Sequence, residues 1–467
     1  MGKYKNLMKN IGILTISNFG SKFLAFFLVP IYTSVLTTSE YGNFDYINVT
    51  ISLLVPLLTL NISESALRFL LDKNNSANKG KIVGITFKYC TYSILIVILL
   101  CILNKYLIFS SVINQYTIYF ILFYLSNLIY QVMQNIVRGY DKLAKIAVAG
   151  IINSILMLSL NIIFLLCIKM GIHGFFLANI ISMVVSSLYL MIGIDYGNIS
   201  GKDKQLEKSM TSYSKPLMFN SLGWWINNVS DRYFVTYMCG IAENGIYSIA
   251  YKIPSLLSIF QTIFNQAWII SSVKNIESKN NEYFINNVYN IYNIAMVLIC
   301  SLLIMSSKIL AKFLYLNEFY NAWKYMPFLL ISIVFGALSG VIGGVFTATK
   351  DTKILGSTTF LGAIINIILN YLLIIVFGTM GAAISTMISY FAVWMFRYIS
   401  LKKITSIRIR IFRDLVTYFI LLLQGIILLL GCKYELILEI LCVLFITILN
   451  IDTIKKVSKM VIRKEID

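Results

Sequence analysis

Long apolar runs, separated by short clusters of charged and turn-forming residues, follow one another along the whole chain. A helix that crosses about 30 Å of hydrocarbon needs roughly 20 mostly apolar residues. The pattern therefore predicts an all-α integral membrane protein with about 14 transmembrane helices. The expected spans are residues 12–36, 44–71, 82–103, 115–137, 146–168, 174–194, 216–238, 246–273, 284–306, 324–348, 355–377, 381–398, 414–431 and 434–451.

A polar segment near the middle of the chain divides the first twelve expected spans into two sets of six. The sequence thus predicts an N-lobe at 1–195, a cytoplasmic linker at 196–215 and a C-lobe at 216–400. Residues 401–467 are expected to form two accessory spans and a basic tail. No connection is long enough to hold a domain outside the membrane, so we expect two pseudo-symmetric six-helix lobes plus an accessory pair.

Composition and charge agree with this pattern. The chain has 58% hydrophobic and 13% charged residues, whereas soluble domains average about 25% charged residues. The net charge of +19 comes from short basic clusters. With the N-terminus inside, 28 of the 39 Lys and Arg residues fall in inner segments and 6 in outer loops. Because positive charges stay preferentially on the cytoplasmic side, both termini are expected there, and nucleic acid is not an expected partner.

The sequence offers little material for catalysis. His173 is the single histidine, so neither a metal cluster nor a Ser-His-Asp triad can be assembled from imidazoles. The seven cysteines lie in apolar stretches without a CxxC pair, and no GxxxxGK[ST] motif is present. We therefore expect no catalytic residues, no metal site and no cofactor. Coupling to H+ or Na+ stays open.

The two halves resemble each other in sequence. At a shift of 207, Gly171 and Gly174 fall on Gly378 and Gly381. Two six-span repeats of this kind run parallel, and transporters built this way hold substrate at the repeat interface. Chance recurrence of short glycine turns is the alternative interpretation. A shift of 203 pairs Gly20 with Gly223, Thr33 with Thr236, Glu40 with Glu243, Gly42 with Gly245 and Phe44 with Tyr247.

Several charges fall inside the expected spans. A charged side chain at bilayer depth costs about 2.5–3.5 kcal/mol on insertion scales, so such groups face a hydrated cavity or a partner. Cations that line a cavity would suit a diphosphate, because Arg grips phosphate bidentately and Lys acts as a point charge. Aromatic faces could also contact sugars. The candidate substrate-binding residues are Lys22, Arg68, Lys88, Trp224, Trp225, Arg232 and Lys252, and the candidate gating or ion-coupling residues are Glu64 and Asp231.

Each candidate also has a structural interpretation. Glu64 and Arg68 have the spacing of a helical salt bridge, and Asp231 could pair with Lys252. Lys88 could extend its ammonium group to the inner membrane interface. The tryptophans could belong to an interfacial aromatic belt. The glycines at 336, 340 and 344 predict close helix packing, with bending of the span as the functional alternative.

Four segments resemble the polysaccharide repeat-unit flippases of the multidrug/oligosaccharidyl-lipid/polysaccharide exporter superfamily. The resemblance implies a two-lobed helical bundle that moves an undecaprenyl-diphosphate-linked oligosaccharide to the outer leaflet of a bacterial cytoplasmic membrane. It also implies membrane lipid, polysaccharide polymerase and glycosyltransferases of the same pathway as partners. The segments are TSEYGNFDYI (38–47), SESALRFLLDK (63–73), NNVSDRYFVTYMCGIAENGIYSIAYKIPSLL (227–257) and GAIINIILNYLLIIVFGTMGAAISTMISY (362–390).

Two other functions stay open. A cation-coupled multidrug antiporter of the same superfamily would be expected to use acidic residues in the first lobe, whereas the first expected span carries Lys22 and no carboxylate. A membrane enzyme of glycan assembly would need paired carboxylates for acid-base work. Outside the spans of Glu64 and Asp231, most of the carboxylates fall in loops.

Overall fold

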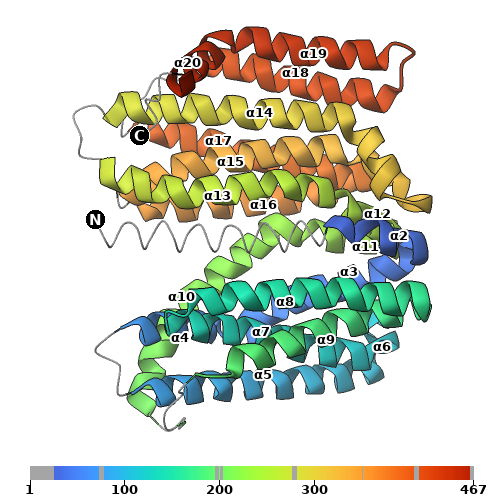
Figure 1. Ribbon diagram of the computed structural model, residues 1–467, viewed down its shortest axis with the longest axis vertical. Coiled ribbons are helices and arrows are strands. Elements are labelled where there is room, and N and C mark those ends of the chain that lie inside the picture. The colour runs from blue at the N-terminus through green and yellow to red at the C-terminus, as the bar shows by residue number, and fades with distance from the viewer. Residues whose placement is uncertain are drawn as a thin grey trace. The chain divides into compact units, whose positions relative to one another are not determined.

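The computed structural model describes residues 26–72, 78–194, 199, 203–275, 281–349, 351–403 and 410–462. All regular elements in these ranges are helices (Figure 1). Among them, nine are long and apolar enough to cross a membrane, and one bent pair passes the same test as a single span. The expected all-α membrane fold is confirmed, and the count of 14 spans stays a prediction. Most of the first expected span, including Lys22, lies outside the described residues.

The chain forms two compact units, Met1–Trp225 and Ile226–Asp467. In unit 1, α7 is the central helix because α3, α4, α5, α8 and α9 all pack against it. Unit 1 contains α2 (Val29–Val35), α3 (Thr38–Leu58), α4 (Ile62–Leu71), α5 (Lys79–Leu107), α6 (Ser111–Gln115), α7 (Thr117–Gly139), α8 (Leu143–Asn161) with its π-helical extension η2 (Ile162–Cys167), α9 (Gly171–Met191) and most of α10 (Lys204–Val229).

Unit 2 repeats this order and adds a helical hairpin. Its central helix is α15, which packs against α13, α14, α16, α17 and α18. The helices are α11 (Asp231–Cys239), α12 (Ile241–Ala250), α13 (Lys252–Asn275), α14 (Asn281–Leu314), the short 3-10 helix η3 (Asn317–Lys324), α15 (Met326–Ala348), α16 (Thr352–Phe377), α17 (Thr379–Leu401), α18 (Ile411–Leu430), α19 (Glu435–Leu449) and α20 (Ile451–Ile462).

Glycines at the same place in the two units support the predicted repeat. Gly171 and Gly378 both have φ of +57°, which a glycine adopts without strain. Three residues later, Gly174 and Gly381 each press against the preceding helix. A Cβ on Gly381 would lie 2.2 Å from the carbonyl oxygen of Leu373. The recurring glycines therefore have one structural role in both units: each lets a helical hairpin close tightly.

Two expected elements differ from the structure. The span at 44–71 is broken: α3 and α4 meet at 57°, where Leu60 and Asn61 have φ of +52° and +53°. Pro56 precedes the break, and Asn tolerates the left-handed conformation better than most residues. Likewise, residues 204–215 of the expected linker form the first half of α10. Polarity suggested a loop there, but Lys, Gln, Glu and Met are good helix formers.

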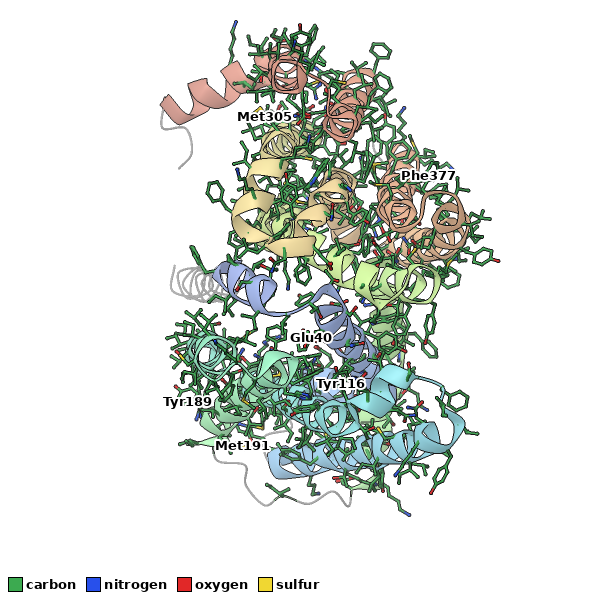
Figure 2. All side chains as sticks on the ribbon, turned by 90° about the vertical axis from the view of Figure 1, so that its right-hand side faces the viewer. Glu40, Tyr116, Tyr189, Met191, Met305 and Phe377 are labelled. Atoms are coloured by element: carbon green, nitrogen blue, oxygen red, sulfur yellow. The ribbon has the colours of Figure 1, made fainter. Side chains whose placement is uncertain are left out.

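The outer surfaces of the helices carry large apolar side chains, drawn in carbon green in Figure 2. Phe377 at the end of α16 is 55% exposed, and exposed Leu, Ile and Phe residues follow α5, α16 and α19. An exposed apolar surface of this extent is expected where lipid is the solvent. The protein is therefore a multi-pass membrane protein, and its buried polar groups are the exceptions that need an explanation.

Candidate functional site

The most concentrated polar site of unit 2 surrounds Asp231, a carboxylate that is 2% exposed at the start of α11. Its Oδ2 accepts hydrogen bonds from the hydroxyls of Tyr247 at 2.7 Å and Tyr251 at 2.6 Å, and from Thr386 at 3.3 Å. Its Oδ1 accepts from the backbone N–H of Arg232 at 2.9 Å. Tyr247 and Tyr251 are four residues apart and so lie on one helical face. Helices α12 and α17 thus position hydroxyl groups around the carboxylate of α11.

The part of the chain that the structure describes does not contain the ion pair between Asp231 and Lys252 that the sequence offered as a structural interpretation. Among the described residues, no ion pair joins these two side chains, because the tyrosine hydroxyls already occupy the carboxylate. Arg232 places its guanidinium 5.1 Å from the centre of the Tyr251 ring. Attraction between a cation and the face of an aromatic ring stabilises this arrangement. Tyr251 therefore contacts both residues: its hydroxyl donates to Asp231, and its ring faces the Arg232 guanidinium.

A layer of buried amides and hydroxyls adjoins this site. Asn370 donates to the Oδ1 atom of Asn366 at 2.9 Å, and both residues are at most 1% exposed on α16. Ser230 also donates to this Oδ1 at 3.4 Å, and Ser385 donates to the backbone carbonyl of Asn366 at 3.1 Å. Ser385 directly precedes Thr386, so the layer continues into the Asp231 site. Polar side chains thus connect α11, α16 and α17 within the unit.

Arg397 on α17 is a buried cation near the end of the expected span 381–398 that was not among the candidate site residues. It is 6% exposed. Its guanidinium donates to the hydroxyls of Thr358 at 3.1 Å and Thr359 at 3.0 Å, and to the carbonyl of Ser339 at 2.8 Å. A Cβ on Gly343 would lie 3.1 Å from its terminal nitrogen. The group therefore joins α15, α16 and α17 through neutral acceptors, a role that its position near a span end did not reveal.

In unit 1 the expected salt bridge between Glu64 and Arg68 is not formed among the described residues. Instead, Asn135 of α7 donates to Glu64 at 3.3 Å and to Ser63 at 3.1 Å. Arg68, one turn further along α4, is exposed. Because the buried amide on the neighbouring helix holds the carboxylate, the Arg68 guanidinium stays accessible. The bond between Asn135 and Glu64 depends on tertiary packing, so the spacing of residues along α4 could not predict it.

Lys88 is neutralised within unit 1. Its ammonium lies 2.9 Å from a carboxylate oxygen of Glu207 on α10, and the hydroxyl of Tyr89 donates to the same carboxylate at 3.2 Å. Nearby, Lys81 lies 3.1 Å from Asp203. The backbone N–H of Leu206 and the Lys81 ammonium lower the pKa of Asp203. These pairs hold the start of α10 against α5. They were not predicted, because residues 196–215 were expected to form a linker and not part of a helix.

The two candidate tryptophans have different surroundings. Trp225 donates through its indole N–H to Ser52 at 3.0 Å and to the carbonyl of Val49 at 3.3 Å, both on α3. Trp224 is 47% exposed. Asn61, at the break between α3 and α4, donates to Ser221 at 3.1 Å. Trp225 therefore helps to hold α10 against α3, and Trp224 is half-exposed.

The glycine series on α15 packs closely, as predicted. Gly336, Gly340 and Gly344 face Gln261, Asn265 and Trp268 of α13, and a Cβ on Gly344 would lie 2.5 Å from the Trp268 ring. The indole N–H of Trp268 donates to the carbonyl of Val341 at 2.8 Å. His173, to which no role was assigned, lies among aromatic rings, 5.2 Å from Tyr119.

A pair of glutamates occupies matching positions in the two units. Glu243 near the start of α12 accepts hydrogen bonds from Tyr325 at 3.0 Å and Thr379 at 3.1 Å. In unit 1, Glu40 forms a capping box with Thr37 at the start of α3. Figure 2 labels Glu40 and Tyr116 within that unit. Glu40 therefore caps its own helix, whereas Glu243 links the first turn of α12 to Tyr325 and Thr379.

Two repeated helical units with apolar outer surfaces and buried ionisable groups are typical of a helical membrane transporter, and comparisons with known proteins narrow this class. A family model described as polysaccharide biosynthesis protein matches residues 7–270, more than half of the chain. A second model, MatE, matches residues 216–372. The chain therefore belongs to the polysaccharide biosynthesis protein family, within the superfamily of multidrug, oligosaccharidyl-lipid and polysaccharide exporters, which confirms the resemblance seen in the sequence.

Two curated relatives are more distant. The chain is 24% identical over 188 residues to the probable low-salt glycan biosynthesis flippase Agl15 of Haloferax volcanii, which covers 39% of each protein. It is 24% identical over 209 residues to the uncharacterized membrane protein MJ1068 of Methanocaldococcus jannaschii, which covers 43% of this chain and 40% of the relative. The matched segments thus span about two fifths of the length of these relatives.

Solved structures share the fold. The lipid II flippase MurJ in an inward closed conformation aligns over 97% of this chain and 100% of its own, with a TM-score of 0.71 and 16% identity. An inward-facing multidrug resistance MATE family transporter aligns over 85% of this chain and 99% of its own, with a TM-score of 0.66 and 14% identity. At these identities the likeness is one of fold.

Proposed function

We propose that the protein is a flippase that moves undecaprenyl-diphosphate-linked oligosaccharide repeat units from the cytoplasmic to the outer leaflet by alternating access, without covalent chemistry. The observation that carries this proposal is the match of the polysaccharide biosynthesis family over residues 7–270. That range includes the expected cationic residues, from Lys22 to Lys252. The protein would act in the cytoplasmic membrane with both termini inside, between the glycosyltransferases that build the repeat unit and the polymerase that consumes it.

The cations expected inside the spans are the candidates for the diphosphate. Arg68 is exposed and is not committed to Glu64. Arg232, whose guanidinium lies 5.1 Å from the centre of the Tyr251 ring, is a candidate because Arg can grip phosphate bidentately. Lys22 and Lys252 remain candidates from their depth in the expected spans. Lys88 is less suited because Glu207 already neutralises it.

The glycan part of the substrate needs apolar faces and hydrogen-bonding groups. Trp224 offers an exposed indole face of the kind that packs against sugar rings. Trp225 serves the packing of α10 through its bonds to α3. We therefore assign glycan contact to Trp224 and a positioning role to Trp225.

Transport can be driven by an ion bound at Asp231. The carboxylate and the hydroxyls of Tyr247, Tyr251 and Thr386 form an oxygen-rich site within 3.3 Å of one atom, Oδ2. Oxygen atoms are the ligands of hard cations such as Na+, and a carboxylate can bind H+ in the same place. Asp231 is therefore the proposed coupling residue, with Glu64 as the candidate in unit 1.

Complementation of a flippase-null strain tests the function. Wild-type protein is expected to restore surface polysaccharide and to clear the lipid-linked intermediate trapped inside. Asp231→Asn and Arg232→Ala are expected to fail at normal protein levels. Tyr292→Phe is a control that should retain activity, because the hydroxyl of Tyr292 has no partner among the described residues. Collapse of the H+ or the Na+ gradient should stop transport by wild-type protein. Full clearance of the intermediate by every variant would contradict the assigned residues.

The match of the MatE model over residues 216–372 favours a second candidate, a cation-coupled antiporter of drugs. The same strain separates the two functions. Resistance to cationic dyes without restoration of polysaccharide would support the antiporter and reject the flippase.

A further inference from the structure

The hairpin of α18 and α19 packs on α14 through buried polar groups (Figure 1). Gln424 on α18 and Ser301 on α14 are both 0% exposed. The amide of Gln424 donates to the carbonyl of Ser301 at 2.9 Å and accepts from its hydroxyl at 2.7 Å. This two-way bond uses the inward-facing polar atoms of both residues. The seam is therefore built to leave few polar atoms without a partner.

Glu439 on α19 is an exception in this seam. It is 1% exposed, and both of its carboxyl oxygens are buried without a hydrogen-bond partner among the described residues. One turn away, Glu435 is paired: its Oε2 lies 2.6 Å from the ammonium of Lys308. Lys308 also lies 4.6 Å from the centre of the Trp323 ring. The nearest cation is thus already held by Glu435 and an indole face.

An unpaired carboxylate cannot stay charged in such surroundings at low cost. Burial of an ion without a partner costs several kcal/mol even after relaxation, so the group takes up a proton or binds a cation. A metal cation needs several oxygen ligands, and the seam offers one carboxyl group beside an amide committed to Ser301. The Lys308 ammonium would also repel a second cation. A proton meets the same need with one O–H bond and no further ligands.

We propose that Glu439 is a proton-binding site, and that its carboxyl is neutral when α19 is docked on α14 at neutral pH. The titratable or charged groups that face it are Lys308 on α14 and Glu435 and Cys442 on α19, while α18 presents the neutral amide of Gln424. The proposal is independent of the transported substrate.

The contrast with Asp414 shows why Glu439 needs the proton. Asp414, at the other end of the hairpin, is 0% exposed, but its Oδ1 receives two bonds from Arg413 at 2.7 and 3.0 Å. Asp414 therefore has a cation in contact, whereas Glu439 has none. Loss of the proton from Glu439 would leave a bare charge between α14 and α19 and would weaken their packing.

Infrared spectroscopy of the full-length protein in lipid nanodiscs tests the site directly. Wild-type protein at neutral pH should show the C=O stretching band of a protonated carboxyl in a dry environment. Glu439→Gln should lose this band, and Glu435→Gln, changed one turn away on the same helix, should keep it. An unchanged band in Glu439→Gln would overturn the proposal.

Thermal unfolding provides a second measurement that does not depend on the amide variant. Glu439→Met has a similar shape and no charge. If the carboxyl is neutral in the folded protein, the melting temperature of wild-type protein should fall relative to Glu439→Met as the pH rises above the ordinary pKa of a glutamate. At lower pH the difference between the two melting temperatures should become constant. A difference that does not change with pH would contradict proton binding.

Discussion

The two units have similar helical scaffolds but differ in chemistry at two matching positions. Phe44 of unit 1 lies in a group of aromatic rings with Tyr41, Phe123 and Phe175, at centroid distances of 6.2, 5.6 and 4.4 Å. Its counterpart at the shift of 203, Tyr247, instead donates a hydrogen bond to Asp231. The same backbone position therefore carries a ring of an aromatic group in unit 1 and a hydrogen-bond donor to a carboxylate in unit 2.

A second pair of positions repeats the contrast. At the shift of 207, Arg397 in unit 2 corresponds to Leu190 in unit 1. Leu190 is 0% exposed in an apolar interior, and Arg397 is 6% exposed among neutral acceptors. Unit 1 thus relies on apolar packing at both positions and unit 2 on buried hydrogen bonds. Ion chemistry is therefore expected to depend more on unit 2.

The largest effect is expected from the glycines that both units share. Gly381→Ala would place a Cβ 2.2 Å from the Leu373 carbonyl oxygen, whereas Gly174→Ala would place one 2.8 Å from the Cβ of Phe164. Backbone cannot move aside as side chains can, so Gly381→Ala should cost about 3 kcal/mol and Gly174→Ala clearly less. The yield of folded protein and its melting temperature in detergent measure both. Equal losses would mean that the two hairpins tolerate crowding alike.

These glycines also show how far the sequence determines the fold. Apolar periodicity and the recurring Gly171 and Gly378 predicted the helices and the repeat, because both are local properties of the chain. The site was only partly predictable. Asp231 was found as a charge inside a span, but its tyrosine partners come from α12 and the Glu207 partner of Lys88 from a segment assigned to a loop. Such pairings form through tertiary packing and leave no fixed spacing.

An intermediate effect is expected when unit 2 is made to resemble unit 1. Tyr247→Phe gives unit 2 the residue type of Phe44 and removes a 2.7 Å hydrogen bond to a buried carboxylate. Loss of a bond to a charged group costs about 1.5–3 kcal/mol, so the melting temperature and transport should both fall. Tyr292→Phe is the matched control, because the hydroxyl of Tyr292 is buried without a partner among the described residues. A similar loss of melting temperature and transport in both variants would show that the hydrogen bond to Asp231 contributes no more than the removal of any buried tyrosine hydroxyl.

The smallest effect on stability is expected from the pair that closes unit 1. Lys88 and Glu207 are 33% and 19% exposed, and a partly exposed pair of this kind contributes about 0–1 kcal/mol. Lys88→Glu and Glu207→Lys alone should each lower transport slightly by loosening α10 from α5. The double variant, which restores opposite charges, should recover wild-type transport in the complementation strain. If Lys88 instead contacts the diphosphate, the double variant would stay as inactive as Lys88→Glu, since the positive charge would then lie on the wrong helix.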